Sequence, residues 1–377
     1  MLLPYIKIGC HGGVIMNLDE NDVEFLFNPN KLIYNYNGYK KLGNIFYPLK
    51  TNSNDMIIYN LKKIFNPEDG FLISNTKHYD ILRKLNVTPD RMCLINVLSG
   101  NGTIKYLYNQ GVRFFVFDSI SILKYFMTYA NLKECKIAIR LNTMEMFKDT
   151  LMHLGANTDE CIEMIKLLKN KCQKVGISFY LQTKIKNEKN AMEKMLNYIK
   201  QNFNDCKLDF INIAGIKKYS ELNEKYLKKI KTSMDLSEII LEPGKYLVGN
   251  TFDMITKVIR LKIIEDKSIV IIKNGIYSGL LDVLLYNEKF HFYFKTLNND
   301  YVEFSYVKDN KHDYEMYMCG GSSDSGDVIG TVYINKKYKD EIKVGTEILI
   351  KNIGSYFEEF FMDYGGDINK IFVEVDE

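Results

Sequence analysis

The feature that most constrains the fold is a repeated alternation between a short apolar run and a longer segment with helical periodicity, between residues 45 and 241. The apolar runs are rich in Ile, Val, Phe and Tyr and are nearly continuous, which is typical of strands buried on both faces. They lie at 45–49, 71–74, 92–97, 113–117, 136–141, 176–181, 209–213 and 238–241. Eight such strand–helix units in about 200 residues predict a closed (β/α)₈ barrel; an open doubly wound sheet is the structural alternative.

Two of the segments between these runs begin with clear helix signals. Asn157 is followed by Glu160 and then by Cys161, which begins an apolar face. Asn54 stands in the same way before a segment with apolar residues spaced by four and three. Asn is a favoured N-cap residue, so both positions predict the start of a helix.

After about residue 254 the pattern changes to short strands with turn-prone residues between some of them and no helices. The candidate strands are 257–264, 269–272, 290–295, 301–307, 314–318, 328–334, 347–351 and 371–375. This pattern predicts a mostly antiparallel β-barrel or sandwich. Residues 5–8 and 13–16 also look like strands of this second domain. We therefore expect a barrel domain at 25–256 and a β-domain made of 1–24 and 257–377.

Composition excludes several classes of protein. The 377 residues carry a net charge of +3, which argues against a dedicated nucleic-acid binder. The sequence contains no apolar run of about 18 residues, so it predicts no membrane-spanning helix. No signal peptide is evident, so the expected compartment is the cytoplasm. The seven cysteines form no C-x-x-C pair and the five histidines form no H-E-x-x-H motif. Disulfide scaffolds, zinc ribbons and metallohydrolases are therefore disfavoured, and no metal is expected.

In a (β/α)₈ barrel the catalytic side chains come from the C-terminal ends of the strands. The polar or small residues at those positions are Lys50, Asn75, Asp118, Arg140, Thr183, Gly215 and Glu242. A lysine is ordinarily a solvated surface group. A lysine after the first strand together with a glutamate ending the last strand changes that interpretation. An amine that can form a Schiff base and a carboxylate that can hold a pyridinium proton are the minimal requirements of pyridoxal phosphate chemistry.

Several segments resemble the fold-type III pyridoxal-phosphate decarboxylases, which act on ornithine, arginine, lysine, diaminopimelate or carboxynorspermidine. The segment 46–53 (FYPLKTNS) resembles their Y-A-V-K-A-N/C-S, and 242–248 (EPGKYLV) resembles E-P-G-R-Y/x-x-V. The segment 320–327 (GGSSDSGD) resembles G-P-T-C-D-S-x-D, and 354–356 (GSY) resembles G-A-Y. The segments 274–277 and 285–288 resemble D-G-V-Y and L-Y-D-H. The matches run in order from about residue 40 to 365 and imply an alanine-racemase-like barrel followed by a β-domain.

The resemblance implies that pyridoxal 5′-phosphate is the cofactor. Lys50 would form a Schiff base with it, and Glu242 would accept a hydrogen bond from its pyridine nitrogen. Tyr180 replaces a histidine that stacks on the ring, and Arg140 matches an arginine close to the cofactor. The remaining cofactor-binding residues, expected around the phosphate, are Thr183, Gly215, Gly244, Lys245 and Tyr356.

Four residues of the resembling segments concern the substrate and the proton it receives. Ser323 replaces a cysteine that the family places across the subunit interface to protonate the product, and a serine is a weaker acid than a thiol. Asn287 replaces an aspartate that holds the distal amine of the substrate. Asp324 or Glu288 would then supply the negative charge.

The resulting hypothesis is a decarboxylase of a small basic or diamino-acid-like substrate in polyamine, lysine-type or specialised metabolism. The family's architecture implies a homodimer whose active site lies at the interface, with no nucleic-acid or membrane partner. Two alternatives remain open. In the first, the chain decarboxylates a modified amino-acid group, such as a carboxynorspermidine-like or aminocarboxypropyl substrate. In the second, it is a non-catalytic homologue that regulates a true decarboxylase.

Overall fold

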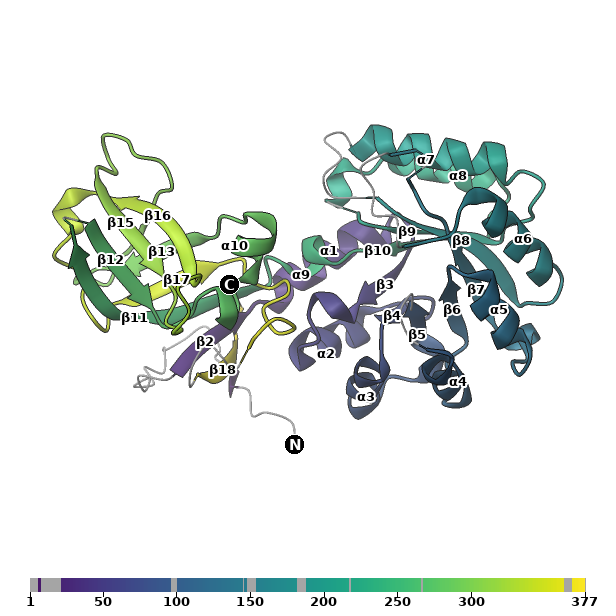
Figure 1. Ribbon diagram of the computed structural model, residues 1–377, viewed down its shortest axis with the longest axis horizontal. Helices are drawn as coiled ribbons and strands as arrows, with labels where there is room; N and C mark the ends of the chain where they lie inside the picture. Colours follow the sequence, from purple (N-terminus) through teal and green to yellow (C-terminus); the bar gives the residue numbers. More distant parts are fainter. Residues whose placement is uncertain are drawn as a thin grey trace. The chain divides into compact units, whose positions relative to one another are not determined.

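A computed structural model describes residues 6–7, 22–95, 100–144, 146–147, 154–181, 188–216, 218–265, 267–362 and 368–376. The chain divides into two compact units (Figure 1). One unit, here called the barrel unit, is Ile33–Leu247, and the other, here called the β-unit, combines Met1–Leu32 with Val248–Glu377.

Eight parallel strands form a closed barrel, which confirms the predicted architecture. Around the barrel they follow the order β10-β3-β4-β5-β6-β7-β8-β9, so each strand pairs with its neighbour in sequence and the last strand pairs with the first. Their bounds are β3 Asn44–Pro48, β4 Gly70–Ile73, β5 Met92–Ile95, β6 Phe114–Phe117, β7 Lys136–Arg140, β8 Lys174–Tyr180, β9 Phe210–Ala214 and β10 Glu238–Glu242.

Helices lie outside the strands of this barrel (Figure 1). They are α1 Pro29–Lys40, α2 Asp55–Ile64, α3 Thr76–Lys84, α4 Asn101–Asn109, α5 Ile120–Met127, α6 Thr158–Leu168, α7 Glu188–Asn202, α8 Glu224–Ser233 and the short α9 Lys245–Val248. Both predicted N-caps are confirmed. The Asn54 side chain accepts a hydrogen bond from the Met56 N–H, and the Asn157 side chain accepts one from the Glu160 N–H.

The interior of the barrel is layered from one end to the other. Its middle is an apolar cluster of buried side chains, to which alternate residues of the strands contribute. The members are Phe46, Leu72, Cys93, Phe114, Val116, Ala138, Phe210 and Ile240. In β10, Ile240 belongs to this cluster, while Glu238 and Glu242 lie two residues to either side and are also buried. Each end of the interior therefore carries a polar layer.

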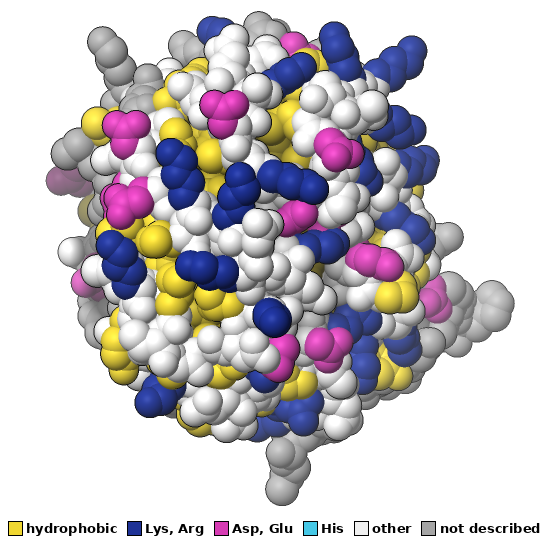
Figure 2. Space-filling view, turned by 90° about the vertical axis from the view of Figure 1, so that its right-hand side faces the viewer, with side chains coloured by type: hydrophobic (Ala, Val, Ile, Leu, Met, Phe, Trp, Pro, Cys, Tyr) yellow, Lys and Arg dark blue, Asp and Glu magenta, His cyan; other side chains and the backbone are white. Residues whose placement is uncertain are grey.

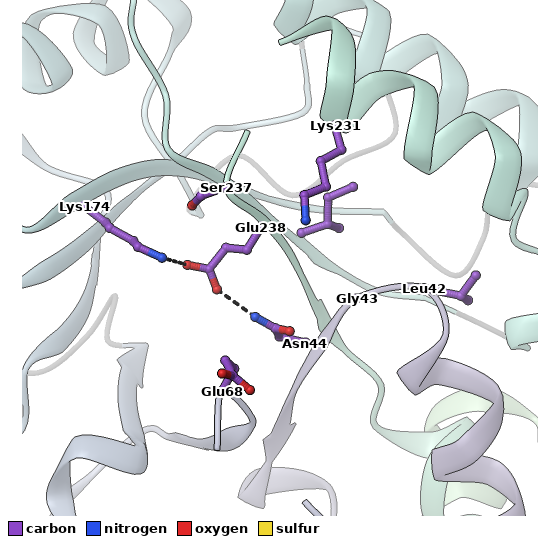
Figure 3. Close-up of a pocket in the computed structure, with 9 residues that line it drawn as sticks. Leu42, Gly43, Asn44, Glu68, Lys174, Lys231, Ser237 and Glu238 are labelled. Atoms are coloured by element: carbon purple, nitrogen blue, oxygen red, sulfur yellow. Dashed lines mark hydrogen bonds and ion pairs between the residues drawn. The ribbon is translucent and has the colours of Figure 1, made fainter. Parts of the chain in front are cut away.

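The N-terminal end of the barrel is closed by a network of paired charges. The Glu238 carboxylate accepts hydrogen bonds from the Nζ atoms of Lys136 and Lys174, both at 2.8 Å, and from Asn44 Nδ2 at 2.9 Å. The Lys136 ammonium lies 4.6 Å from the centroid of the Phe210 ring, at a distance that allows a cation–π contact. A pocket of about 270 Å³ borders the same network, and Figure 3 shows Lys174 and Asn44 converging on Glu238 there.

The β-unit is a mostly antiparallel assembly of strands, as predicted. Its longest strand, β11, pairs antiparallel with β2, β12 and β17, whereas β12 pairs with β15 and β18 with β2 in parallel. The strands are β1 Ile6–Lys7, β2 Asp22–Phe27, β11 Phe252–Ile264, β12 Lys267–Ile272, β13 His291–Lys295, β14 Tyr301–Glu303, β15 Tyr314–Cys319, β16 Val328–Ile334, β17 Glu347–Lys351 and β18 Asn369–Glu374. Phe25, Phe252, Phe357 and Phe372 pack against one another in its core.

Four details of this unit differ from the sequence prediction or lie outside the described residues. Strand β2 was not predicted, although its alternating burial follows from the alternation of polar and apolar residues up to Phe25. A short helix, α10 Leu281–Tyr286, lies where no helix was expected. The predicted strand at 13–16 lies outside the described residues. Residues 25–32 and 248–256, assigned to the barrel domain in the sequence prediction, group here with the β-unit, in which β2 pairs with β11 and β18.

The surface carries charges of both signs. On the face shown in Figure 2, Lys and Arg side chains are spread among Asp and Glu side chains. Among the described residues, no helix has the length and apolar character needed to cross a membrane.

Candidate active site

Lys50 lies at the C-terminal end of the barrel, in a single 3₁₀ turn, Leu49–Thr51, that directly follows β3. Leu49 and Thr51 are buried on either side of it, while the Lys50 side chain is exposed to solvent. The turn is therefore anchored by its two flanking residues and presents the lysine at the mouth of the barrel.

Hydrogen bonds tie this turn to the strand before it and to the helix after it. The Tyr47 hydroxyl donates to the Asn52 carbonyl at 2.8 Å, and the Asn54 N–H donates to Asn52 Oδ1 at 2.9 Å. Asn54 is itself the N-cap of α2. Because both ends of the turn are fixed, the position of Lys50 is set by the scaffold rather than by a free loop.

The electrostatic surroundings of Lys50 suit an amine that must lose its proton. Although one side of the residue meets solvent, the surrounding protein desolvates the ammonium, and this burial lowers the pKa of Lys50. The nearby Glu242 carboxylate acts in the opposite direction, and the Arg140 guanidinium lowers the pKa further. A lowered pKa increases the fraction of neutral amine, which is the nucleophilic form.

Glu242 ends β10 and is buried, with 7% of its surface exposed. Its Oε1 accepts a hydrogen bond from Asn212 Nδ2 at 2.6 Å, and Asn212 on β9 is fully buried. Burial raises the pKa of Glu242, and Arg140, Asn212 and Lys50 partly offset this rise. The site therefore holds a carboxylate close to two cations, but within a desolvated environment.

Arg140 ends β7 and is buried beside this carboxylate. Its Nη1 donates to Ser178 Oγ on β8 at 3.0 Å, and its guanidinium carbon lies 5.8 Å from the centroid of the Tyr180 ring. Tyr180 ends β8 and is half-buried. Asp118, after β6, also acts electrostatically on Arg140, and burial raises the pKa of Asp118.

Two glycines at the same end of the barrel leave no room for a side chain. Gly215 follows β9 with a φ of +75°, and a Cβ there would lie 1.9 Å from the Leu181 carbonyl oxygen. A Cβ on Gly244, two residues after β10, would lie 2.6 Å from Thr51 Oγ1 in the Lys50 turn. Both positions let the backbone approach closely, as a phosphate held by N–H groups requires. Lys245, half-buried, begins α9 directly after Gly244.

A second group of predicted site residues lies in the β-unit, on the loop between β15 and β16. Ser323 is exposed there and Asp324 is half-buried. Asp324 Oδ1 accepts hydrogen bonds from the Gly326 N–H at 2.6 Å and from the Tyr277 hydroxyl at 3.1 Å. The segment 274–277, which resembled the same family as the loop, is therefore in contact with it.

Asp327 joins this loop to the segment 274–277 through hydrogen bonds. It is 3% exposed, and its Oδ1 accepts from the Ile276 N–H at 2.7 Å while its Oδ2 accepts from the Ser322 N–H at 3.1 Å. A Cβ on Gly275 or on Gly320 would approach Asp327 Oδ1 to 2.1 or 2.3 Å. The two glycines thus admit the carboxylate that joins the two segments.

The remaining predicted residues of the β-unit lie near the end of α10 and on the turn after β17. Asn287 is the C-cap of α10, is exposed and has a φ of 53°. Glu288 follows it and is half-buried. Tyr356, with a φ of 64°, has its ring centroid 6.4 Å from that of Tyr286.

Sequence reasoning missed Asn212 and Ser178, which contact Glu242 and Arg140. Each is a lone polar residue at an inward position of an otherwise apolar stretch of strand, and that pattern was a usable signal. Thr183, predicted to contact a phosphate, lies outside the described residues. The barrel unit therefore brings together Lys50, Arg140 and Glu242, and the β-unit holds a separate predicted set.

The residues at the barrel mouth fit pyridoxal phosphate. An amine with a lowered pKa suits an aldehyde, a buried carboxylate suits a pyridine N–H, and close-approach glycines suit a phosphate. Among the described residues, no cluster of His, Cys, Asp or Glu is arranged to hold a metal ion.

Comparison with known proteins agrees with this chemistry. Residues 34–249, more than half of the chain, match the family described as pyridoxal-dependent decarboxylase, pyridoxal binding domain. A lysine/ornithine decarboxylase from Selenomonas ruminantium is 23% identical over 332 residues, covering 83% of this chain and 78% of the relative. An antizyme inhibitor 2 from Xenopus laevis is 22% identical over 351 residues, covering 82% of this chain and 71% of the relative.

Among solved structures, the arginine decarboxylase of Paramecium bursaria Chlorella virus bound to agmatine has the same fold, with a TM-score of 0.76 and 19% identity. The alignment covers 94% of this chain and 96% of that one. The family predicted from the ordered sequence segments is confirmed. The chain belongs to the pyridoxal-dependent decarboxylases, enzymes whose cofactor is pyridoxal 5′-phosphate.

Proposed function

We propose that the protein removes the α-carboxylate of a basic or diamino-acid-like substrate as CO₂ and releases the corresponding amine. The observation that carries this proposal is that Lys50, whose pKa burial lowers, and the buried Glu242 carboxylate interact electrostatically at the mouth of the barrel. Relatives named as lysine/ornithine and arginine decarboxylases support the substrate class.

Pyridoxal 5′-phosphate held at the barrel mouth would supply an electron-accepting ring for the electron pair that remains when the carboxylate leaves. Lys50 supplies the amine that anchors the cofactor covalently. Glu242 would accept a hydrogen bond from the pyridine N–H, and Tyr180 would stack on one face of the ring. The backbone N–H groups of Gly215 and Gly244 would hold the phosphate, with Lys245 as its counter-charge. Thr183 and Tyr356 are the further candidates for phosphate contacts.

Residues of the β-unit are proposed to complete the site from a second subunit. Ser323 would return the proton to the product carbon, and Asp324 would face the distal ammonium of the substrate. The Asp324 carboxylate is already fixed through one oxygen by Gly326 and Tyr277, which leaves its other oxygen for a ligand. Mixing a Lys50→Ala chain with a Ser323→Ala chain tests this homodimer. Activity restored in the mixture supports a shared site, whereas two inactive variants that remain inactive together oppose it.

This chain departs from the family pattern at a residue expected to bind the distal group of the substrate. Asn287 offers a neutral amide instead of a carboxylate, and an amide is a poor partner for a buried ammonium. This departure keeps a second substrate class open, a carboxylated polyamine or an aminocarboxypropyl group. In either class Asp324, or the neighbouring Glu288, supplies the negative charge.

The test is CO₂ release by the cofactor-loaded enzyme from ornithine, lysine, arginine, diaminopimelate and carboxylated polyamines. We expect turnover of one of these compounds, and its loss in Lys50→Ala. Equal and negligible release from all of them, in a protein that does bind the cofactor, would contradict the proposal. Replacing Asn287 by Asp should then shift preference toward the diamino acids.

A non-catalytic regulatory role is the second candidate. The similarity to an antizyme inhibitor and the replacements at Ser323 and Asn287 favour it. Substituting Ser323→Cys separates the two. A gain in decarboxylation would mean that an active site is present and that the native serine limits proton return. A wild type and a variant that are both without turnover would favour the regulatory role.

A further inference from the structure

The residue that holds Glu242 in place was not among those assigned from the family pattern. Asn212 lies on β9, opposite Ile240 in the register of the neighbouring strand β10. Phe210 and Ile240 both face the apolar middle of the barrel, so Asn212 and Glu242, each two residues further on, point to the same interior. The two side chains meet one layer nearer to the C-terminal end.

The contact between them is short and buried. Asn212 Nδ2 donates to Glu242 Oε1 at 2.6 Å, Asn212 is 0% exposed and Glu242 is 7% exposed. A hydrogen bond to a carboxylate favours the ionised form, most strongly where water is excluded. Burial alone raises the pKa of Glu242, and the Asn212 hydrogen bond opposes that rise.

The amide also divides the carboxylate into two unequal oxygens. Oε1 is engaged by Asn212, whereas Oε2 remains for another donor. Asn212 Oδ1 has no hydrogen-bond partner in the described part of the chain. The unsatisfied amide oxygen is a cost that a purely structural residue, such as leucine, would avoid.

The charged and titratable groups that act on Glu242 come from three other elements. Arg140 on β7 and Lys50 after β3 are cations, and Cys93 on β5 is buried and electrostatically coupled to the carboxylate. The cations favour ionisation as charges, but no hydrogen bond from either accompanies the one from Asn212 among the described contacts of Glu242. Asn212 is therefore the group that sets the carboxylate's orientation.

We propose that Asn212 is a positioning residue, which keeps Glu242 ionised and fixes Oε1 so that Oε2 faces the pyridine N–H of the cofactor. This inference rests on the proposed role of Glu242. It gives β9 a role in binding the cofactor, in addition to the role proposed for Gly215, which follows this strand. An aspartate at this position would compete with Glu242 for a proton, and a leucine would leave the carboxylate without its donor.

The first experiment measures the unfolding of the cofactor-free protein at about pH 5 and about pH 8. A carboxyl whose pKa is raised on folding destabilises the fold increasingly as pH rises from its usual value through the folded one. Asn212→Leu should raise the pKa of Glu242 further, so its loss of stability should be greater at about pH 8 than at about pH 5. In the Glu242→Gln background that pH-dependent difference should disappear.

Asn35→Leu is the matched control, because Asn35 is also buried and its side-chain amide donates at 2.9 Å to the Leu247 carbonyl, a group that does not titrate. Its loss of stability should be the same at both pH values. A constant loss for Asn212→Leu, or a loss unchanged by Glu242→Gln, would overturn the proposal because a merely structural role predicts both.

The second experiment titrates pyridoxal 5′-phosphate into the wild type and the Asn212→Leu and Asn212→Asp variants. We expect both variants to bind about tenfold more weakly, as follows from losing one hydrogen bond to a charged group. Equal affinity in all three proteins would overturn the cofactor part of the inference. If the wild type itself fails to bind, the proposed function fails instead, and the unfolding cycle still decides whether Asn212 holds Glu242.

Discussion

The two ends of the barrel interior place a glutamate of the same strand in opposite situations. At the N-terminal end, burial alone would raise the pKa of Glu238, but Lys136 and Lys174 outweigh it, and the pKa is lowered. At the C-terminal end, burial raises the pKa of Glu242, and Arg140, Asn212 and Lys50 only partly offset this effect.

The barrel thus separates the residues that stabilise it from the residues that carry its chemistry. Glu238 accepts hydrogen bonds from the ammonium groups of Lys136 and Lys174 and from the Asn44 amide, so its negative charge is compensated. Figure 3 shows the contacts with Lys174 and Asn44. The hydrogen bond from Asn212 leaves Glu242 with a second oxygen to offer. In barrels of this kind the C-terminal end carries catalysis and the N-terminal end carries stability. The predictions below separate the two ends.

The largest effect is expected at the C-terminal end. Glu242→Gln should lower kcat/KM on the order of 10²–10³-fold, because a preorganised charge at the reacting group is lost. Folding should be retained, since a neutral amide is easier to bury than a carboxylate. CO₂ release together with urea unfolding measures both effects. Wild-type turnover in this variant would show that Glu242 has no part in the reaction.

The matching change at the N-terminal end should act on stability instead. Glu238→Gln leaves Lys136 buried over the phenylalanine rings without its carboxylate, and we expect a loss of about 3 kcal/mol in the free energy of unfolding. Cofactor affinity should be unchanged. Glu224→Gln is the control, because the Glu224–Lys228 pair lies on the exposed surface of α8 and should contribute little. A cofactor-binding defect in Glu238→Gln would break the separation between the ends.

Glycines at the two ends offer a second matched pair. A Cβ on Gly215 would lie 1.9 Å from the Leu181 oxygen at a φ of +75°, and a Cβ on Gly43 would lie 2.5 Å from the Ile239 oxygen. Each change to alanine should cost about 2 kcal/mol of stability. Only Gly215→Ala should also weaken the binding of pyridoxal 5′-phosphate, measured by titration. An equal loss of cofactor affinity in Gly43→Ala would mean that the effect comes from a general destabilisation of the barrel.

The smallest effect concerns the pH dependence of the cofactor-free protein. Because the pKa of Glu238 is lowered from its usual 4.5, its stabilisation is present above that value and is lost as pH falls through the folded pKa. Because the pKa of Glu242 is raised, its contribution is most favourable below 4.5 and is lost as pH rises through the folded pKa. Glu238→Gln should therefore reduce the loss of stability that occurs as pH falls below 4.5. Glu242→Gln should reduce the loss of stability that occurs as pH rises above 4.5. Urea midpoints across pH, unchanged in both variants, would contradict this account.

The sequence predicted the barrel because strands buried on both faces are nearly continuous apolar runs. It predicted Lys50 and Glu242 because they stand where such runs end. It did not predict Asn212 or Ser178, since their roles depend on which neighbouring strand lies beside them. Strand β2 and the six-residue α10 were missed because short elements carry little periodic signal. The parallel pairing of β12 with β15 is a long-range contact that no local pattern reveals.

The most direct test of the central claim asks which lysine holds the cofactor. Lys136 is a physical rival to Lys50, because burial lowers its pKa as well, but its ammonium is paired with Glu238. Borohydride reduction of the cofactor-loaded protein followed by peptide mapping identifies the labelled residue. The account predicts a pyridoxyl group on Lys50 alone. A label on Lys136 or Lys174, or none on Lys50, would contradict it.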